Sequence, residues 1–218
     1  MDSERLAVYL RSLEREDSLL IQEIEAHARE NFVPIMRKET GAFLKTLITM
    51  KKPSRILEVG TATGYSAICM SQVLGEDGTI TTIEKYEKRI PIARENFRKA
   101  GKEKQITLLE GDAAEVLPAL TGPYDFIFMD AAKGQYLHFL PEVMRLLAPG
   151  GVLVTDNVLQ DGTILESRFA VTRRDRTIHS RMRDYLYELK HRDDLETAVV
   201  PIGDGVTVSV KKEESTNE

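Results

Sequence analysis

Short apolar runs alternate with longer segments between residues 55 and 157, and in the longer segments apolar positions recur every three or four residues. The short runs have the length and β-branched content of buried strands, and the longer segments have the spacing of amphipathic helices. Strict alternation of the two predicts a parallel, doubly wound sheet with helices on both faces. The predicted strands are RILEVG, GTITTIEK, QITLLEGD, YDFIFMDA and GVLVTDN.

The pattern differs at the two ends of the chain. Residues 1–50 form an N-terminal segment with apolar positions at helical spacing from about residue 6, broken at Pro34, which predicts two or three helices. After a helix predicted around residues 172–190, the run LETAVVPIGDGVTVSVKK indicates two antiparallel strands joined across Asp204-Gly205. The sequence thus predicts one α/β domain over residues 1–218, with a frayed polar tail at 212–218.

Composition narrows the possible classes of protein. A chain of 218 residues with 42% hydrophobic content can bury one sizeable core, and a formal net charge of −5 excludes binding of nucleic acid by bulk charge alone. The N-terminus does not have the pattern of a signal peptide, and no apolar run approaches the roughly 18 residues of a membrane span. We expect a cytoplasmic protein without membrane contact. The single cysteine, Cys69, lies in a helical apolar pattern and is predicted to be a buried thiol.

The segment ILEVGTATGYSA has the order strand, glycine-containing turn and helix that is typical of nucleotide-binding folds. The spacing from Gly60 to Gly64 is G-x-x-x-G, and Ala62 replaces the glycine that lets a backbone approach a pyrophosphate. Glu58 suits the ammonium of an amino-acid group better than it suits a phosphate. The turn therefore predicts a nucleoside ligand without a pyrophosphate.

Acidic residues also end the next two predicted strands. Glu84 can bind both hydroxyls of a ribose, and Asp112 can accept from an adenine amino group while the Ala113 amide donates to the ring. Each acid taken alone, Glu58 included, could instead be a helix N-cap or a solvated loop residue. Their occurrence at successive strand ends favours a shared ligand.

Hard oxygen donors follow two further strands, with Asp130 after YDFIFM and Asp156-Asn157 after GVLVT. The carboxyl ends of parallel strands meet at one crevice, and oxygen donors without His or Cys suit Mg²⁺ or Ca²⁺. Lys133 can reach the same substrate oxygen, so the metal and the lysine together would favour a deprotonated hydroxyl. The alternative for this strand end is that Asp130 caps the next helix and pairs with Lys133.

The motifs EVGTATGYSA, TIEK, GDA, MDAAKGQY, VTDNVL and PIGDG together resemble the cation-dependent O-methyltransferases that use S-adenosylmethionine, the family of the catechol and caffeoyl-CoA enzymes. The resemblance extends from about residue 33 to residue 211 and implies a class I, Rossmann-like methyltransferase fold. Within the family, the order of motifs is most similar to that of the bacterial tRNA 5-hydroxyuridine methyltransferases. The chain has no Trp, which differs from the Trp-walled substrate slot of the catechol branch.

The resemblance implies a role for each matching residue. Asp130, Asp156 and Asn157 would bind Mg²⁺, and Lys133 would be the catalytic residue beside the reacting hydroxyl, together with Asp130. The residues implied around S-adenosylmethionine are Met36, Glu58, Gly60, Ser66, Glu84, Asp112, Ala113 and Asp130.

The segment RFAVTRRDRTIHSRMRD follows the predicted metal site and is rich in arginine. Such a segment can track phosphates, or it can be a solvated, salt-bridged helix face. Tyr136 and Phe169 can stack on a splayed base or belong to the core. The candidate RNA contacts are Arg168, Arg173, Arg174, Arg176, Arg181 and Arg183.

The function that we expect is Mg²⁺-dependent transfer of a methyl group from S-adenosylmethionine to wobble 5-hydroxyuridine in the tRNA anticodon loop, giving 5-methoxyuridine. A small catechol-like or CoA-linked phenol is the alternative substrate. A nucleotide-sensing module is the non-enzymatic alternative, and it would need neither the metal ligands nor Lys133. The family resemblance also leads us to expect a homodimer.

Overall fold

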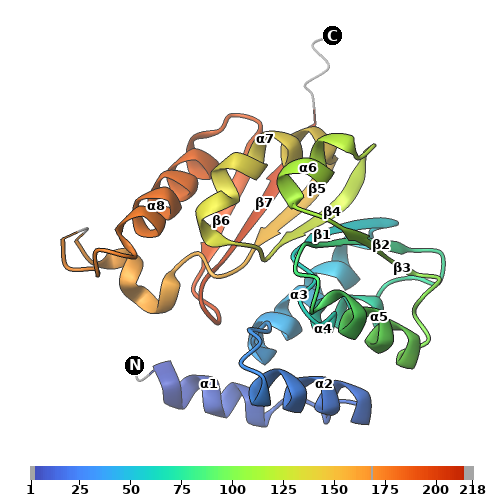
Figure 1. Ribbon diagram of the computed structural model, residues 1–218. Coiled ribbons are helices and arrows are strands. Elements are labelled where there is room, and N and C mark those ends of the chain that lie inside the picture. Colours follow the sequence, from blue (N-terminus) through green and yellow to red (C-terminus); the bar gives the residue numbers. More distant parts are fainter. Residues whose placement is uncertain (1–2, 168, 214–218) are drawn as a thin grey trace.

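Seven strands form one sheet in the order β3-β2-β1-β4-β5-β7-β6, in a computed structural model that describes residues 3–167 and 169–213 (Figure 1). The first five strands pair in parallel, whereas β7 is antiparallel to both β5 and β6. The predicted parallel sheet with a C-terminal antiparallel hairpin is confirmed. The strands are β1 (Arg55–Val59), β2 (Thr79–Glu84), β3 (Ile106–Glu110), β4 (Tyr124–Met129), β5 (Leu147–Thr155), β6 (Leu195–Val200) and β7 (Val206–Lys211).

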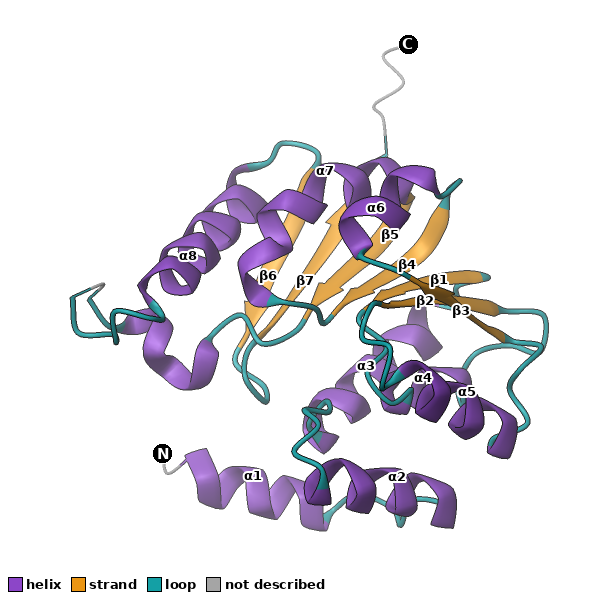
Figure 2. Ribbon diagram, in the orientation of Figure 1, coloured by secondary structure: helices purple, strands orange, loops and turns teal. Residues whose placement is uncertain are grey.

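Helices cover both faces of the sheet (Figure 2). Alternate residues of each central strand point to opposite faces, so Phe126 and Phe128 of β4 pack with α2 to α5, while Ile127 and Met129 pack with α6 to α8. The helices are α1 (Ser3–Ser12), α2 (Leu19–Glu30), α3 (Lys38–Lys51), α4 (Tyr65–Ser71), α5 (Ile90–Lys99), α6 (Ala113–Ala119), α7 (Tyr136–Leu146) and α8 (Arg176–His191), with 3₁₀ turns η1 (Lys133–Gln135) and η2 (Gln160–Leu165).

Two element boundaries differ from the predicted ones. Strand β5 begins at Leu147, before the predicted Gly151, and its register with β4 shifts between Tyr124 and Phe126. Helix α8 begins at Arg176 because Thr172 forms a separate turn, in which its hydroxyl donates to Asp175 Oδ2 at 2.6 Å. Residues 169–175 of the arginine-rich segment therefore lie in a loop that projects beside α8, and residues 176–184 of the segment are helical (Figure 1).

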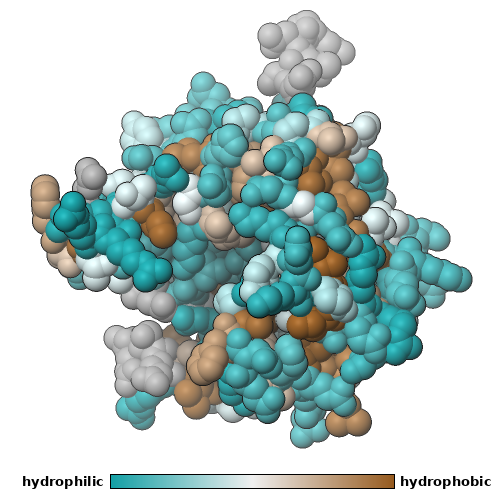
Figure 3. All heavy atoms as spheres, viewed as in Figure 1, coloured by the Kyte–Doolittle hydropathy of each residue, from teal (hydrophilic) through white to brown (hydrophobic). Residues whose placement is uncertain are grey.

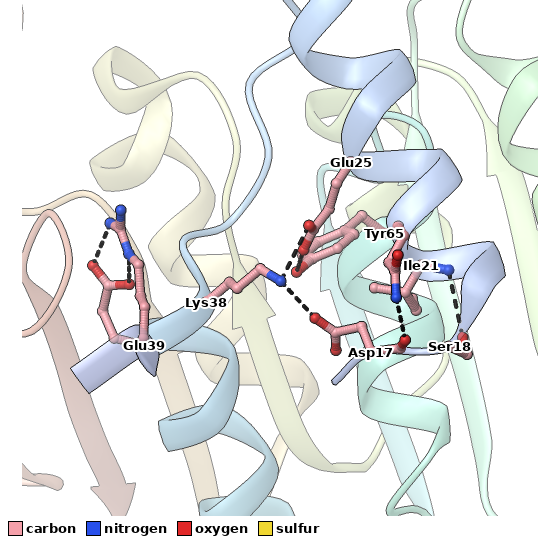
Figure 4. Close-up of polar contacts among 9 residues, drawn as sticks. Asp17, Ser18, Ile21, Glu25, Lys38, Glu39 and Tyr65 are labelled. Carbon is pink, nitrogen blue, oxygen red and sulfur yellow. Dashed lines mark hydrogen bonds and ion pairs between the residues drawn. The ribbon is translucent and has the colours of Figure 1, made fainter. Parts of the chain in front are cut away.

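The N-terminal helices are joined to the rest of the fold by buried and half-buried polar contacts (Figure 4). Lys38 Nζ lies 2.7 Å from Asp17 Oδ2 and 3.2 Å from Glu25 Oε2. The Tyr65 hydroxyl of α4 donates to Glu25 Oε1 at 2.9 Å. These contacts hold α2 against α3 and α4, and they place the connecting residues 31–37 across the carboxyl ends of the strands.

Two other expectations concern single features. Cys69 is buried, which confirms the predicted buried thiol, and burial raises the pKa of that thiol to about 12. Among the described helices, none has both the length and the apolar composition needed to cross a membrane. The predicted frayed tail lies largely outside the described residues, which end at residue 213.

Candidate active site

A cavity of about 810 Å³ opens at the carboxyl ends of β1, β2 and β4. One wall comes from the segment that links α2 to α3, which contributes Pro34, Ile35 and Met36. Lys133 and Gln135 of the η1 turn also line the cavity. Six of the residues predicted to contact the donor line this cavity together with Asp130, and they are Met36, Gly60, Ser66, Glu84, Asp112 and Ala113.

The turn after β1 requires glycine at position 60. Gly60 has φ +107°, and a Cβ there would lie 2.1 Å from the backbone oxygen of Asp130. The Gly60 and Thr61 amides both donate to the Ile83 carbonyl at 3.1 Å. This turn is therefore held closely against the ends of β2 and β4. Backbone and small side chains form this part of the cavity wall as a result.

Glu84 ends β2 and is only 8% exposed. Its carboxylate accepts from the amides of Ala62 at 2.8 Å, Lys85 at 3.0 Å and Tyr86 at 2.8 Å, so it is not a helix N-cap. Asp112 does cap α6, since it accepts from Ala114 N at 3.0 Å, and that bond lowers the pKa of Asp112. Both carboxylates still line the cavity, as a ribose and an adenine site would require.

Glu58 lies behind the cavity wall. Its side chain is fully buried and accepts from Ser66 Oγ and Thr82 Oγ1, each at 2.5 Å. It is neither an N-cap nor a solvated acid, and burial raises its pKa to about 8. Ser66 forms the wall in front of it, so any effect of Glu58 on a ligand passes through the position of Ser66.

The predicted metal ligands meet at the ends of β4 and β5. Asn157 Nδ2 donates to Asp130 Oδ1 at 3.0 Å, and the Asn157 amide donates to Asp156 Oδ1 at 2.7 Å. Asn157 has φ +62°, a left-handed conformation that Asn tolerates better than most residues. Asp130 and Asn157 line the cavity, whereas Asp156 is 3% exposed and lies behind them.

The charges of this cluster favour a bound cation. Burial raises the pKa of Asp130 to about 6, and burial together with the Asp130 charge raises the pKa of Asp156 to about 7. Over the described part of the chain, no three His, Cys, Asp or Glu side chains form a metal cluster. The candidate donor set is the two carboxylates of Asp130 and Asp156 and the side-chain amide of Asn157. Such oxygen donors suit a hard divalent ion such as Mg²⁺, which keeps several of its waters.

Lys133 begins the η1 turn and lies near an acid whose role the sequence pattern did not indicate. Its Nζ lies 3.8 Å from Asp204 Oδ2, and Arg37 Nη2 donates to Asp204 Oδ1 at 3.3 Å. Asp130 does not cap η1, because no side chain caps this turn and Asp130 Oδ1 accepts from Asn157. The motif PIGDG contained Asp204, but its pattern indicated only a hairpin turn.

The predicted RNA contacts separate into three groups. Arg168 lies outside the described residues, while Arg173, Arg174 and Arg183 are exposed. Arg176 has its guanidinium carbon 5.9 Å from the centroid of an exposed aromatic ring, and Arg181 Nη1 donates to the Gly134 carbonyl at 3.0 Å. Within residues 3–167 and 169–213, none of the candidate arginines pairs with a carboxylate, so the face is not salt-bridged there. A solvated face and a phosphate-binding face both agree with these exposed arginines.

The two candidate stacking residues differ in exposure. Tyr136 is 1% exposed, packs at 5.4 Å between ring centroids with Tyr185, and donates to the Asp156 carbonyl at 3.2 Å. It is a core residue that supports the predicted metal ligands, and the stacking interpretation is wrong for it. Phe169 is 82% exposed and forms the ring beneath Arg176. On the face of the molecule seen in Figure 3, hydrophilic residues cover much of the surface and hydrophobic residues lie among them.

Comparison with known proteins agrees with this geometry. The family model described as O-methyltransferase matches residues 11–212. The chain is 38% identical over 130 residues to a catechol O-methyltransferase of Niastella koreensis, a match covering 58% of this chain and 59% of that protein. It is 32% identical over 184 residues to caffeoyl-CoA O-methyltransferase of Medicago sativa, covering 78% and 72% of the two chains.

Solved structures show the same fold. A candidate caffeoyl-CoA O-methyltransferase from Staphylococcus aureus superposes with a TM-score of 0.87 at 33% identity, covering 94% of this chain and 98% of its own. An O-methyltransferase of tomaymycin synthesis from Streptomyces achromogenes, solved with S-adenosylmethionine, gives a TM-score of 0.85 at 26% identity, covering 98% and 100%.

The sheet order, the glycine turn after β1 and the acids at successive strand ends define a class I methyltransferase. The chain belongs to the O-methyltransferase family, of the catechol and caffeoyl-CoA type. Family and fold together support S-adenosylmethionine as the methyl donor.

Proposed function

We propose that this protein is a Mg²⁺-dependent O-methyltransferase that converts 5-hydroxyuridine at the tRNA wobble position to 5-methoxyuridine. The observation that carries the substrate proposal is the group of exposed arginines on α8 and the loop before it, which have no carboxylate partner among the described residues. This group adjoins the η1 turn, because Arg181 of α8 donates to the Gly134 carbonyl directly after Lys133.

The catalytic proposal follows from where the reacting groups would lie. The methyl donor would be held in the cavity, with Glu84 binding its ribose and Asp112 its adenine, and Asp130 and Lys133 line the part of the cavity where methyl transfer would take place. A Mg²⁺ ion held by Asp130, Asp156 and Asn157 would supply Lewis acidity that lowers the pKa of the substrate hydroxyl. Lys133 would reinforce that effect as an ammonium, or would receive the hydroxyl proton as a neutral amine. The enzyme otherwise contributes position and alignment for in-line displacement.

Local charge explains how an acidic protein would bind tRNA. With a formal net charge of −5 the chain gains no attraction from its bulk charge, so phosphate binding must come from a local basic surface. Arg173, Arg174 and Arg183 are exposed and, in the described structure, have no carboxylate partner to displace. Phe169 offers an exposed ring on which a splayed base can stack.

The second candidate substrate is a small catechol-like or CoA-linked phenol. The names of the catechol and caffeoyl-CoA relatives favour it. The absence of Trp from the whole sequence weighs against an aromatic slot walled by Trp. A donor-binding module without catalysis would need neither Lys133 nor the metal ligands, whereas this chain has Lys133, Asp130 and Asn157 at the cavity.

Nucleoside mass spectrometry tests the proposal in the cell. We expect tRNA from a strain lacking this protein to lose 5-methoxyuridine and to accumulate 5-hydroxyuridine. Unchanged 5-methoxyuridine in that strain would contradict the tRNA proposal and favour the small phenol.

The homodimer is a further part of the proposal. Helix α1 and the residue that follows it expose apolar side chains, among them Val8 at 61%, Tyr9 at 60% and Leu13 at 62%. A second copy that covers this face would remove them from water, which the hydrophobic effect favours. Light scattering should give twice the monomer mass, and charged substitutions at Val8 and Leu13 should shift it to the monomer.

A further inference from the structure

Three segments far apart in the sequence meet at one rim of the cavity. Arg37 directly follows the segment that forms the cavity wall, Lys133 begins the η1 turn, and Asp204 lies in the turn between β6 and β7. The Asp204 carboxylate contacts both cations, at 3.3 Å from Arg37 Nη2 and 3.8 Å from Lys133 Nζ. The Asp204 side chain is 11% exposed and that of Lys133 is 33% exposed, so water screens this pair less than a surface ion pair.

The backbone fixes the position of Asp204. The Leu159 amide donates to the Asp204 carbonyl and the Val158 amide to the Gly205 carbonyl, both at 2.9 Å. These bonds tie the hairpin turn to the residues that directly follow Asn157.

The other side of the hairpin turn packs against α3. Gly203 has φ +57°, and a Cβ there would lie 2.3 Å from Thr40 Oγ1. Asp204 is therefore held between the metal-ligand loop and the start of α3, whereas the lysine stem is flexible in itself.

We propose that Asp204 is a positioning residue that sets where the Lys133 ammonium stands, and that Arg37 holds the Asp204 carboxylate in turn. Arg37 directly follows Pro34, Ile35 and Met36 of the cavity wall, so one segment contributes both to the cavity and to the position of Asp204. This inference rests on the proposed function only in that Lys133 acts at the reacting hydroxyl, and it is independent of which hydroxyl that is.

Lysine labelling tests the inference without substrate, metal or donor. Brief acylation with acetic anhydride, followed by peptide mass spectrometry, measures how readily each lysine amine reacts. We expect Asp204→Asn and Arg37→Ala to raise labelling at Lys133 while exposed Lys88 stays constant as the internal standard. Asp193→Asn, which removes the same charge from an exposed site, should leave Lys133 labelling unchanged. Unchanged labelling at Lys133 in Asp204→Asn would overturn the inference.

Kinetics test whether that position matters for turnover. A displacement of about 1 Å at a reacting group can lower the rate about 100-fold, so we expect Asp204→Asn to lower kcat by roughly 10- to 100-fold while donor affinity is unchanged. In a Lys133→Ala background, Asp204→Asn should cost no further rate, because residues that act as one unit are not additive. Arg37→Ala should lower kcat by less than Asp204→Asn does. Arg37→Lys, which keeps the positive charge, should have a kcat between those of Arg37→Ala and the wild type.

The outcomes separate this inference from the proposed function. Asp204→Asn could lower kcat equally with and without Lys133, or only in proportion to a lower melting temperature. Either result would mean that Asp204 stabilises the fold and does not position Lys133. If the wild-type protein methylates a small phenol and not tRNA, the substrate proposal fails while the same variants remain measurable on the phenol.

Discussion

Asn157 Nδ2 lies 3.0 Å from Asp130 Oδ1, so a residue after β5 and a residue after β4 share one polar cluster. The parallel register produces this contact, since Met129 pairs with Thr155 just before the two strands end. Burial raises the pKa of both carboxylates in the cluster, which means that the fold places negative charge where water cannot fully stabilise it. A divalent cation would relieve that cost.

Metal removal should therefore stop turnover. We expect excess EDTA to abolish methyl transfer and added Mg²⁺ to restore it, because the hydroxyl would lose its Lewis acid. Asp156→Ala should have the same effect while calorimetry still detects donor binding, since Asp156 does not line the cavity. Full activity in excess chelator would exclude a metal mechanism.

Replacing Lys133 by Ala should lower kcat by ~10²–10⁴-fold, the usual contribution of a general acid–base group. The loss should shrink as pH rises, because the substrate hydroxyl then ionises without help. Rates measured over a pH series check this, with Lys88→Ala at an exposed turn as the control. A loss that is the same at every pH would identify Lys133 as a purely structural residue.

Glu58 should make stability depend on pH. In the unfolded chain its carboxyl ionises near the ordinary pKa of 4.5, whereas in the fold the pKa is about 8 because the side chain is buried. Between these values the folded state binds the extra proton, so stability should fall as pH rises, by at most about 1.4 kcal/mol per pH unit. Urea unfolding from pH 5 to 8 should show a flatter dependence for Glu58→Gln, and equal slopes would contradict the assignment.

Variants of the exposed arginines distinguish the tRNA substrate from the small phenol. Replacing Arg173, Arg174 and Arg176 by Ala should weaken tRNA binding and lower the salt slope by about one for each arginine that binds a phosphate. Donor affinity should stay the same, because none of the three lines the cavity. Arg98→Ala, at the far end of α5, is the control, and unchanged tRNA binding in the triple variant would favour the phenol.

Arg181 should behave differently from the other arginines. Its guanidinium is bonded to the Gly134 carbonyl in the η1 turn, so its removal should disturb Lys133 directly. We expect Arg181→Ala to lower kcat more than it lowers tRNA affinity, and Arg183→Ala, two positions on, to show the reverse. Steady-state kinetics and binding measured on the same tRNA would separate the two effects.

The fold could be predicted from the sequence because the apolar pattern changes period at each element, and the Asp204-Gly205 turn showed the hairpin. The strand-end acids followed from the same reasoning, since parallel strands place their carboxyl ends together. The bonding of Glu58 was not predictable, because Thr82 and Ser66 approach it only in three dimensions. The contact between Arg37 and Asp204 likewise depends on tertiary packing, and so does the burial of Tyr136 against Tyr185.

The central claim is that this chain methylates a tRNA hydroxyl, and purified components test it most directly. The protein would be incubated with Mg²⁺, S-adenosylmethionine and tRNA that carries 5-hydroxyuridine, and the nucleosides would then be analysed by mass spectrometry. The account predicts 5-methoxyuridine in that reaction and none when the chain carries Lys133→Ala and Asp156→Ala. Methylation of catechol or a CoA-linked phenol, with the tRNA left unmodified, would contradict it.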